Sequence, residues 1–317
     1  MTDGVTLVRL HSLGDVVLAQ PCATALAALG PVRFATSGEY VPVVARMPGG
    51  VVPFAVPRAA RQRTLSGLLR DPSAGRVIDL QGGLRTVAAM FPGRPSARFV
   101  TDRRARRRVL SGTGSMPYRA DDFAAVAGLG AQGPPVLARR SMPSPGVRRI
   151  GIVLGGRWPM KSIPEGVAAE TARLLHDLYG AEVVLLGAAA DRGSAAAVSG
   201  AMMGRPHVDR VGSGGVEGLL SDIESLSGLV SPDSGPAHLA AALGVPLLVV
   251  FTSTSPALGF WPEGYPGACA ADGISCRPCH RHGGRSCRTG GAECRGGLVP
   301  RSMADGIAEQ AGLGAVT

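Results

Sequence analysis

Residues 11–16 place a carboxylate beside a glycine turn, directly after an apolar segment. They read HSLGDV, and Gly14 allows the sharp backbone turn that precedes Asp15. A carboxylate there could serve as a general base that removes the proton of an acceptor hydroxyl. Because aspartate is also a good helix N-cap, a capping role for Asp15 is the structural alternative.

A second glycine turn carries the only lysine of the chain. Residues 155–161 read GGRWPMK, and Lys161 is the single lysine among 33 basic residues, the others being arginines. Gly155 and Gly156 can offer backbone N–H groups to phosphate oxygens, and the lysine can add a compact positive charge. These residues therefore predict a diphosphate site, with an exposed loop lysine as the alternative.

A third segment has the composition of a helix start that binds an anion. Residues 231–239 read SPDSGPAHL, with Pro236 suited to the first helical turn. The backbone N–H groups of 234–238 would carry the positive end of the helix dipole toward a ligand. Asp233 or Ser234 could instead simply cap the helix, with His238 incidental, and the two roles are compatible.

Four cysteines lie in a glycine- and arginine-rich stretch near the C-terminus. Cys276, Cys279, Cys287 and Cys294 follow a C-x2-C-x7-C-x6-C spacing. The first pair is spaced like zinc ligands, whereas the second pair matches no standard ribbon. The alternatives are reduced thiols or an oxidised pair. No D-x-D motif occurs, so we expect no metal ion at the anion site.

The elements that must position these residues alternate between strand and helix patterns. Each motif follows an apolar run, and ligands bind beyond the carboxyl ends of strands in parallel α/β sheets. Alternation of this kind predicts parallel sheets with right-handed crossovers. The predicted strands are 5–10, 76–80, 148–154, 181–187, 227–233 and 245–251. The predicted helices are 16–29, 165–179, 216–226 and 236–243.

The chain divides at a linker rich in proline, glycine and arginine, residues 131–147. We expect an N-terminal domain over 1–145 and a C-terminal domain over 146–300, each of ordinary domain size. The second domain includes a cysteine-containing loop at 269–294, and 301–317 forms a closing helix.

Composition indicates a folded, basic protein. Of its 317 residues 45% are hydrophobic and 18% charged, which excludes a disordered chain. No apolar run reaches the roughly 18 residues needed to span a bilayer, and no signal peptide is apparent, so we expect a cytoplasmic protein. The net charge is +10. An arginine cluster at 103–108 predicts a solvated face, or a surface that steers an anionic acceptor.

Four stretches together resemble one enzyme family. SLGD (12–15) with Pro21, VIDLQGGLRT (77–86), WPMKSIPE (158–165) and SPDSGPAHLAAALGVPLLVVF (231–251) are similar, in this order, to motifs of the bacterial heptosyltransferases, family nine of the glycosyltransferases. The C-x-P-C…C…C tail also occurs in many members. Ser234 stands where the family has threonine, and Ser162-Ile163 replaces a basic-aromatic pair.

The resemblance implies an α/β protein of the GT-B fold, with two Rossmann-like domains facing across a cleft. The N-terminal domain would bind the acceptor through Ser12, Gly14 and Gln81, with Asp15 as catalytic base. The C-terminal domain would bind the nucleotide sugar. Its implied donor residues are Lys161, Gly155, Gly156, Gly187, Asp233, Ser234, Gly235 and His238.

The implied activity is inverting, metal-independent transfer of a sugar from a nucleotide sugar, by default ADP-heptose, to an acceptor hydroxyl. The acceptor would be a lipopolysaccharide-core glycan or a secondary metabolite. No cofactor is required; we expect a monomer that binds no nucleic acid, and association with a membrane surface stays open. The alternatives are a basic zinc-containing nucleic-acid-binding protein and a non-catalytic sugar-nucleotide-binding homologue. A nicotinamide-dependent oxidoreductase lacks support, because no G-x-G-x-x-G fingerprint follows the first strand.

Overall fold

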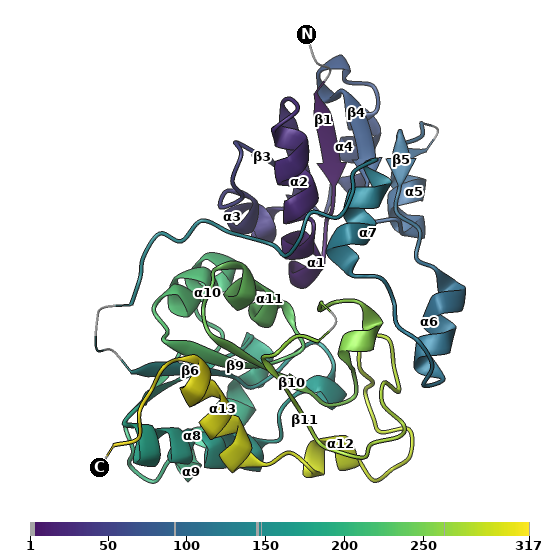
Figure 1. Ribbon diagram of the computed structural model, residues 1–317. Helices are drawn as coiled ribbons and strands as arrows, with labels where there is room; N and C mark the ends of the chain where they lie inside the picture. The colour runs from purple at the N-terminus through teal and green to yellow at the C-terminus, as the bar shows by residue number, and fades with distance from the viewer. Residues whose placement is uncertain (1–3, 92, 144–145, 147, 263, 317) are drawn as a thin grey trace. The chain divides into compact units, whose positions relative to one another are not determined.

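The computed structural model describes residues 4–91, 93–143, 146, 148–262 and 264–316 (Figure 1). These residues form two compact units. The first comprises the described residues up to Arg103 together with Pro117–Arg139, and the second comprises Arg104–Met116 and the described residues from Arg140 onward. The second unit thus includes a segment that precedes the predicted linker.

The first unit is built on a five-stranded parallel sheet in the order β3-β2-β1-β4-β5. Its strands are β1 (Val5–Val8), β2 (Val32–Ser37), β3 (Val52–Val56), β4 (Arg76–Asp79) and β5 (Ala97–Arg98). Its helices are α1 (Leu13–Leu18), α2 (Gln20–Ala27), α3 (Val41–Val44), α4 (Arg61–Leu68), α5 (Leu84–Met90) and α7 (Arg119–Val126). Because all strands are parallel, the loops after β1 and β4 emerge at one edge of the sheet.

The second unit contains a six-stranded parallel sheet in the order β11-β10-β9-β6-β7-β8. Its strands are β6 (Arg149–Val153), β7 (Glu182–Leu186), β8 (His207–Asp209), β9 (Gly228–Pro232), β10 (Leu247–Phe251) and β11 (Ala268–Ala270). Its helices are α6 (Arg103–Leu110), α8 (Glu165–Tyr179), α9 (Arg192–Ala201), α10 (Gly215–Glu224), α11 (Gly235–Ala242), α12 (Glu293–Gly296) and α13 (Pro300–Gln310). Short 3-10 helices, η3 (Pro159–Lys161) and η5 (Pro256–Leu258), lie in the loops after β6 and β10.

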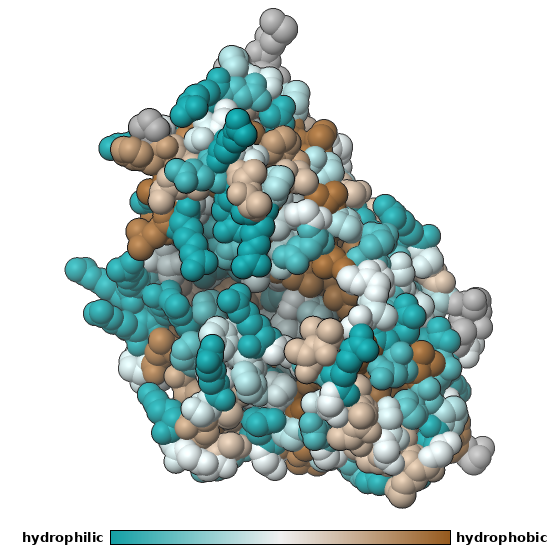
Figure 2. Space-filling view, turned by 180° about the vertical axis from the view of Figure 1, so that it is seen from behind, coloured by the Kyte–Doolittle hydropathy of each residue, from teal (hydrophilic) through white to brown (hydrophobic). Residues whose placement is uncertain are grey.

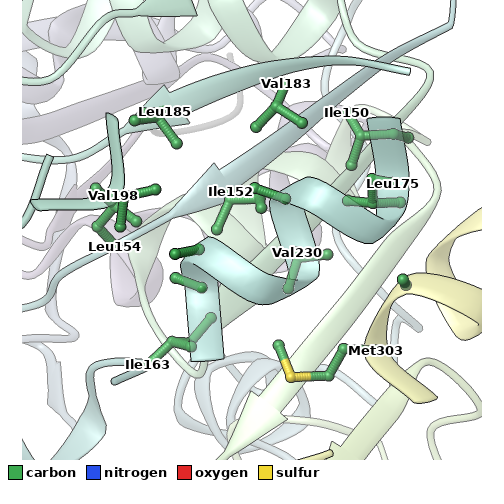
Figure 3. Packing of buried hydrophobic residues seen from close by; sticks show 14 of the residues in the cluster. Ile150, Ile152, Leu154, Ile163, Leu175, Val183, Leu185, Val198, Val230 and Met303 are labelled. Atoms are coloured by element: carbon green, nitrogen blue, oxygen red, sulfur yellow. The ribbon is translucent and has the colours of Figure 1, made fainter. Parts of the chain in front are cut away.

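The core of the second unit explains why its central strands are almost wholly apolar. Side chains of β6, β7 and β9 pack against α8, α9 and α13 (Figure 3). Ile150, Ile152 and Leu175 have no exposed surface, and burial of one such side chain is worth about 1.5–3 kcal/mol. A strand covered on both faces must be apolar on both faces, which is the pattern of a parallel sheet.

Most predicted elements occur where the sequence placed them. Helix 165–179 coincides with α8, and all six predicted strands contain observed strands. The predicted helix over 16–29 is two helices instead, because Pro21 lies in the first turn of α2, where its missing N–H is tolerated. The strands β2 and β3 were not predicted. The described residues of 131–147 form no helix or strand.

The surface of α6 is strongly basic. Its apolar positions, Ala105 and Val109, are buried against Met116 and Leu258, whereas Arg103, Arg104, Arg107 and Arg108 are exposed. In Figure 1, α6 lies on the right. Figure 2 views the molecule from behind, so the same edge is on the left, and hydrophilic side chains protrude there. Among the described residues, no helix is both long and apolar enough to cross a membrane.

Candidate active-site and donor-site residues

Asp15 lies in the first turn of α1, where its carboxylate pairs with an arginine of the preceding strand end. Arg9 Nη2 is 2.5 Å from Asp15 Oδ2, and the Ser12 hydroxyl donates to the same oxygen at 2.8 Å. Ser12, not Asp15, occupies the N-cap position. The Asp15 carboxylate is therefore engaged by side chains, and it does not cap the helix.

The charge around Asp15 keeps it ionised. Burial alone would raise the pKa of Asp15, but Arg9, Arg119 and the Ser12 hydroxyl hold that pKa below its ordinary value. Arg119 comes from α7 and stacks over the Phe99 ring, with its guanidinium carbon 4.7 Å from the ring centre. An ionised carboxylate is ready to accept a proton.

Gln81 braces the loop that carries Asp15. Its Oε1 accepts hydrogen bonds from the backbone N–H groups of Leu10 and His11, each at 3.1 Å. Asp79, at the end of β4, accepts from the Gln81 and Gly82 N–H groups at 2.9 and 3.1 Å. The ends of β1 and β4 are thus tied together, and the Gln81 side chain acts on the loop backbone.

Two residues near Asp15 were missed by the sequence analysis. Arg9 is almost fully buried, which is rare for an arginine, and its sign in the sequence is that it interrupts the apolar run VTLVRL. Its Nη1 also donates to the Leu80 carbonyl oxygen at 2.7 Å. Arg119 gives no local signal, because only the fold brings α7 to the loop after β1.

In the second unit, Lys161 and Asp233 form an ion pair that is almost buried. Lys161 Nζ lies 3.0 Å from Asp233 Oδ2, and only 5% of the Asp233 side chain is exposed. Thr254 Oγ1 donates to Oδ2 and Trp261 Nε1 donates to Oδ1, each at 2.9 Å. Three donors therefore hold the Asp233 carboxylate, which in turn fixes the lysine head group.

The surroundings of Asp233 favour its charged form. Burial opposes ionisation, but Lys161, His238 and the Trp261 hydrogen bond lower the pKa of Asp233 below its ordinary value. The His238 ring stacks on the Trp261 ring with centroids 4.5 Å apart and planes 12° apart. Both His238 and Asp233 are buried, so their visible role is to build the site wall.

The start of α11 supplies the polar surface next to this pair. Ser234 is the N-cap, with extended backbone, and Pro236 lies in the first turn. Ser234 and Gly235 are partly exposed, and the first turn of a helix leaves N–H groups without partners inside the helix. Within 234–238, Pro236 has no N–H and the His238 N–H donates to the Ser234 carbonyl oxygen at 3.4 Å. The N–H groups of Ser234, Gly235 and Ala237 are therefore the ones that could act with Lys161 to stabilise an anion.

Gly155 and Gly187 follow two neighbouring strands, β6 and β7, and both adjoin Asp191. A Cβ atom on Gly155 would lie 1.8 Å from Asp191 Oδ1, and one on Gly187 would lie 2.9 Å from Oδ2. Any side chain at Gly155 would therefore displace the carboxylate. Gly156 is exposed, with open space around it. Asp191 was not predicted, although its place after a strand is a usable signal.

The four cysteines of the C-terminal stretch are free thiols. Burial, followed by the proximity of Cys279, Cys276 and Cys287, raises the pKa of the Cys294 thiol. Within the described part of the chain, no group of three or more His, Cys, Asp or Glu residues has a metal-binding arrangement.

A cavity of about 750 Å³ also lies in the second unit, bounded by β11 and α13. Cys269, Asp272 and Glu309 contribute to its lining. Lys161, Asp233 and Ser234 do not line this cavity, so it is separate from the candidate donor site.

Known proteins resemble this chain in part of its sequence and in its fold. Residues 138–281 match the family model described as Glycosyltransferase family 9 (heptosyltransferase). This segment contains Lys161 and Asp233. Among proteins with curated functions, no sequence matches the chain significantly.

Solved structures match over nearly the whole chain. The ADP-heptose lps heptosyltransferase II of Escherichia coli shares 19% identity and a TM-score of 0.71, over 97% of this chain and 98% of that one. A glycosyl transferase family 9 protein from Veillonella parvula DSM 2008 shares 15% identity and a TM-score of 0.73, over 98% and 97%. Escherichia coli heptosyltransferase WaaC with ADP-2-deoxy-2-fluoro heptose shares 18% identity and a TM-score of 0.59, over 85% and 94%. The predicted α/β class, with two parallel sheets of the GT-B type, is confirmed.

Proposed function

Because residues 138–281 carry a domain of glycosyltransferase family 9 (heptosyltransferase), we propose that this protein transfers a sugar from a nucleotide sugar to an acceptor hydroxyl. The observation that carries the proposal is the Lys161–Asp233 pair beside the start of α11. It provides a fixed positive charge and backbone N–H donors at one place, which suits a leaving diphosphate.

The donor in this proposal is ADP-linked, with heptose as the default sugar. The solved WaaC structure contains an ADP-heptose analogue, and its fold is that of this chain. At the carboxyl ends of β6 and β7 the Asp191 carboxylate occupies the space that side chains at Gly155 and Gly187 would take, and in this proposal the adenosine part lies beside this carboxylate. A carboxylate in this position can accept hydrogen bonds from ribose hydroxyls.

The proposed reaction is one in-line displacement at the anomeric carbon. Asp15 accepts the proton of the acceptor hydroxyl while the acceptor oxygen bonds to that carbon. The bond from the anomeric carbon to the diphosphate oxygen breaks, and its electron pair leaves with the nucleoside diphosphate. Lys161 and the α11 N–H groups stabilise this charge. A single displacement inverts the configuration.

A divalent cation has no role in this mechanism, because Lys161 and α11 supply the positive charge. The absence of a D-x-D motif supports this part of the proposal. We expect transfer to continue in EDTA, and complete loss of turnover in EDTA would contradict it.

The acceptor in this proposal is anionic, either a lipopolysaccharide-core glycan or a charged secondary metabolite. The exposed arginines of α6 support an anionic acceptor or an anionic membrane surface that presents it. A nucleic-acid ligand has less support than a nucleotide sugar, because nucleic-acid binding would not explain the Lys161–Asp233 pair.

The test is a thermal-shift screen with ADP, GDP, UDP and dTDP, followed by the matching sugar nucleotides. Ligand at 100 times its Kd should stabilise the folded state by about 2.7 kcal/mol. We expect ADP to stabilise the protein selectively, and Lys161→Met to remove the effect. Asp15→Ala should abolish transfer and leave ADP binding intact. Equal shifts with all four nucleotides, or with none, would refute the proposed donor.

A further inference from the structure

The four-cysteine stretch contacts the loop that carries Lys161 (residues 155–161, the lysine loop) directly, although the proposed reaction gives the stretch no role. We propose that residues 279–284 of this stretch are part of the donor site and position Lys161. Gly283 is the positioning residue, and its lack of a side chain is what lets Lys161 reach Asp233. The inference rests on the proposed function in one respect, namely that Lys161 contacts the diphosphate.

Gly283 lies against the aliphatic stem of Lys161. A Cβ atom on Gly283 would be 2.4 Å from Lys161 Cγ and 2.9 Å from Cδ, closer than nonbonded carbons come. It would also be 3.2 Å from Trp158 Cβ. Lysine has a long, flexible side chain whose ordering costs entropy. Here Asp233 holds the head group and the Gly283 backbone restricts the stem.

The two loops are joined by hydrogen bonds around this contact. The Met160 N–H donates to the Gly284 carbonyl oxygen at 3.1 Å, and Thr252 Oγ1 donates to the Met160 carbonyl oxygen at 2.7 Å. The Cys279 N–H donates to the Ser253 carbonyl oxygen at 3.2 Å. Residues 279–284 are therefore tied both to the lysine loop and to the end of β10.

Gly283 also has a positive φ of +80°, so a substitution adds backbone strain as well as contact. Two nearby glycines separate these effects. Gly273 (φ +65°) and Gly290 (φ +89°) share the left-handed backbone, but a Cβ atom on either would meet nothing within 4 Å. Alanine at Gly290 or Gly273 thus reproduces the strain and leaves Lys161 undisturbed.

The experiment compares binding of ADP and adenosine by calorimetry in wild type, Gly283→Ala, Gly290→Ala and Lys161→Met. We expect Gly283→Ala to weaken the affinity for ADP about tenfold, which is the size of one lost charge-assisted contact. The affinity for adenosine should stay within about twofold of the wild-type value. Gly290→Ala should bind both as the wild type does. Adding Gly283→Ala to Lys161→Met should cause no further loss, because both changes act through one side chain.

The outcomes distinguish the inference from the function on which it rests. If the wild type does not bind ADP, or Lys161→Met binds it normally, the proposed function is wrong. If Lys161→Met no longer binds ADP while Gly283→Ala binds ADP as tightly as Gly290→Ala does, only the positioning role of Gly283 is wrong. Equal loss of ADP and adenosine in Gly283→Ala would also overturn it, because general damage to the domain affects both ligands.

Discussion

At the scale of single residues, both candidate sites contain a carboxylate paired with a cation, but the surroundings of the two carboxylates differ. Asp15 shares its carboxylate with Arg9 and Ser12 and is the more exposed of the two carboxylates. Asp233 is saturated by its three donors. In our proposal the first carboxylate is the one that accepts a proton, and the second serves as an anchor for Lys161.

The first prediction concerns Arg9→Met, which removes the nearest positive charge from Asp15. Because burial then dominates, we expect the pKa of Asp15 to rise. The acid limb of the kcat/KM profile, which reports the base in the free enzyme, should move to higher pH. Arg33→Met, which breaks the partly buried Arg33–Asp71 pair elsewhere in the first unit, is the control and should leave the profile unchanged. An unshifted acid limb in Arg9→Met would argue against Asp15 as the base.

The second prediction concerns Asp233→Asn, which leaves the Lys161 ammonium without its counter-charge. Breaking a buried ion pair in this way costs about 3–5 kcal/mol of unfolding free energy, measured by urea denaturation at pH 7. The folded-state pKa of Asp233 is lowered, so its contribution is present above the unfolded pKa and is lost as pH falls through the folded value. The gap between wild type and variant should therefore narrow below about pH 4. A pH-independent gap would contradict the assignment.

At the scale of elements, parallel strands bring the loops to one edge, and a few hydrogen bonds then fix each loop. Gln81 links the ends of β4 and β1, and Thr252 links the end of β10 to the lysine loop. Function at this level depends on contacts between loops that are distant in sequence.

The third prediction tests the Gln81 link. Gln81→Leu leaves the Leu10 and His11 N–H groups without their acceptor, at a cost of about 1–3 kcal/mol each if they stay buried. We expect kcat to fall while ADP affinity is unchanged, since the second unit is untouched. Gln81→Glu keeps an acceptor oxygen and should restore much of the rate. Normal turnover in Gln81→Leu would show that the loop carrying Asp15 keeps its conformation without the Gln81 hydrogen bonds.

A fourth prediction belongs to α6. If its arginines meet an anionic surface, Arg107→Glu with Arg108→Glu should weaken binding to phosphatidylglycerol vesicles, and added salt should do the same. The double variant Arg58→Glu with Arg76→Glu changes the net charge equally at other exposed arginines and serves as the control. If both double variants lower co-sedimentation with the vesicles equally, the effect comes from net charge and not from α6.

At the scale of the whole molecule, the fold class could be predicted from the sequence, but the side-chain contacts within the candidate sites could not. The apolar runs at 148–154 and 245–251 identify strands because a parallel sheet buries both faces. Lys161 and Asp233 were each singled out, but nothing local indicated that they form a pair. Arg119 and Gly283 act through contacts made only by folding, so their sequence neighbourhoods carry no sign of them. The edge strands β8 and β11 are three residues long, which is too short to show a period.

Both tryptophans of the chain belong to the surroundings of Lys161. Trp158 lies in the lysine loop, and Trp261 donates its indole N–H to Asp233. Both tryptophans therefore lie in the second unit, one bonded to Asp233 and the other in the loop that carries Lys161, so tryptophan emission reports on this unit. Titration with ADP should change the emission without any attached dye. An acceptor bound only in the first unit should leave the tryptophan emission unchanged, so one titration can tell which of the two units a ligand occupies.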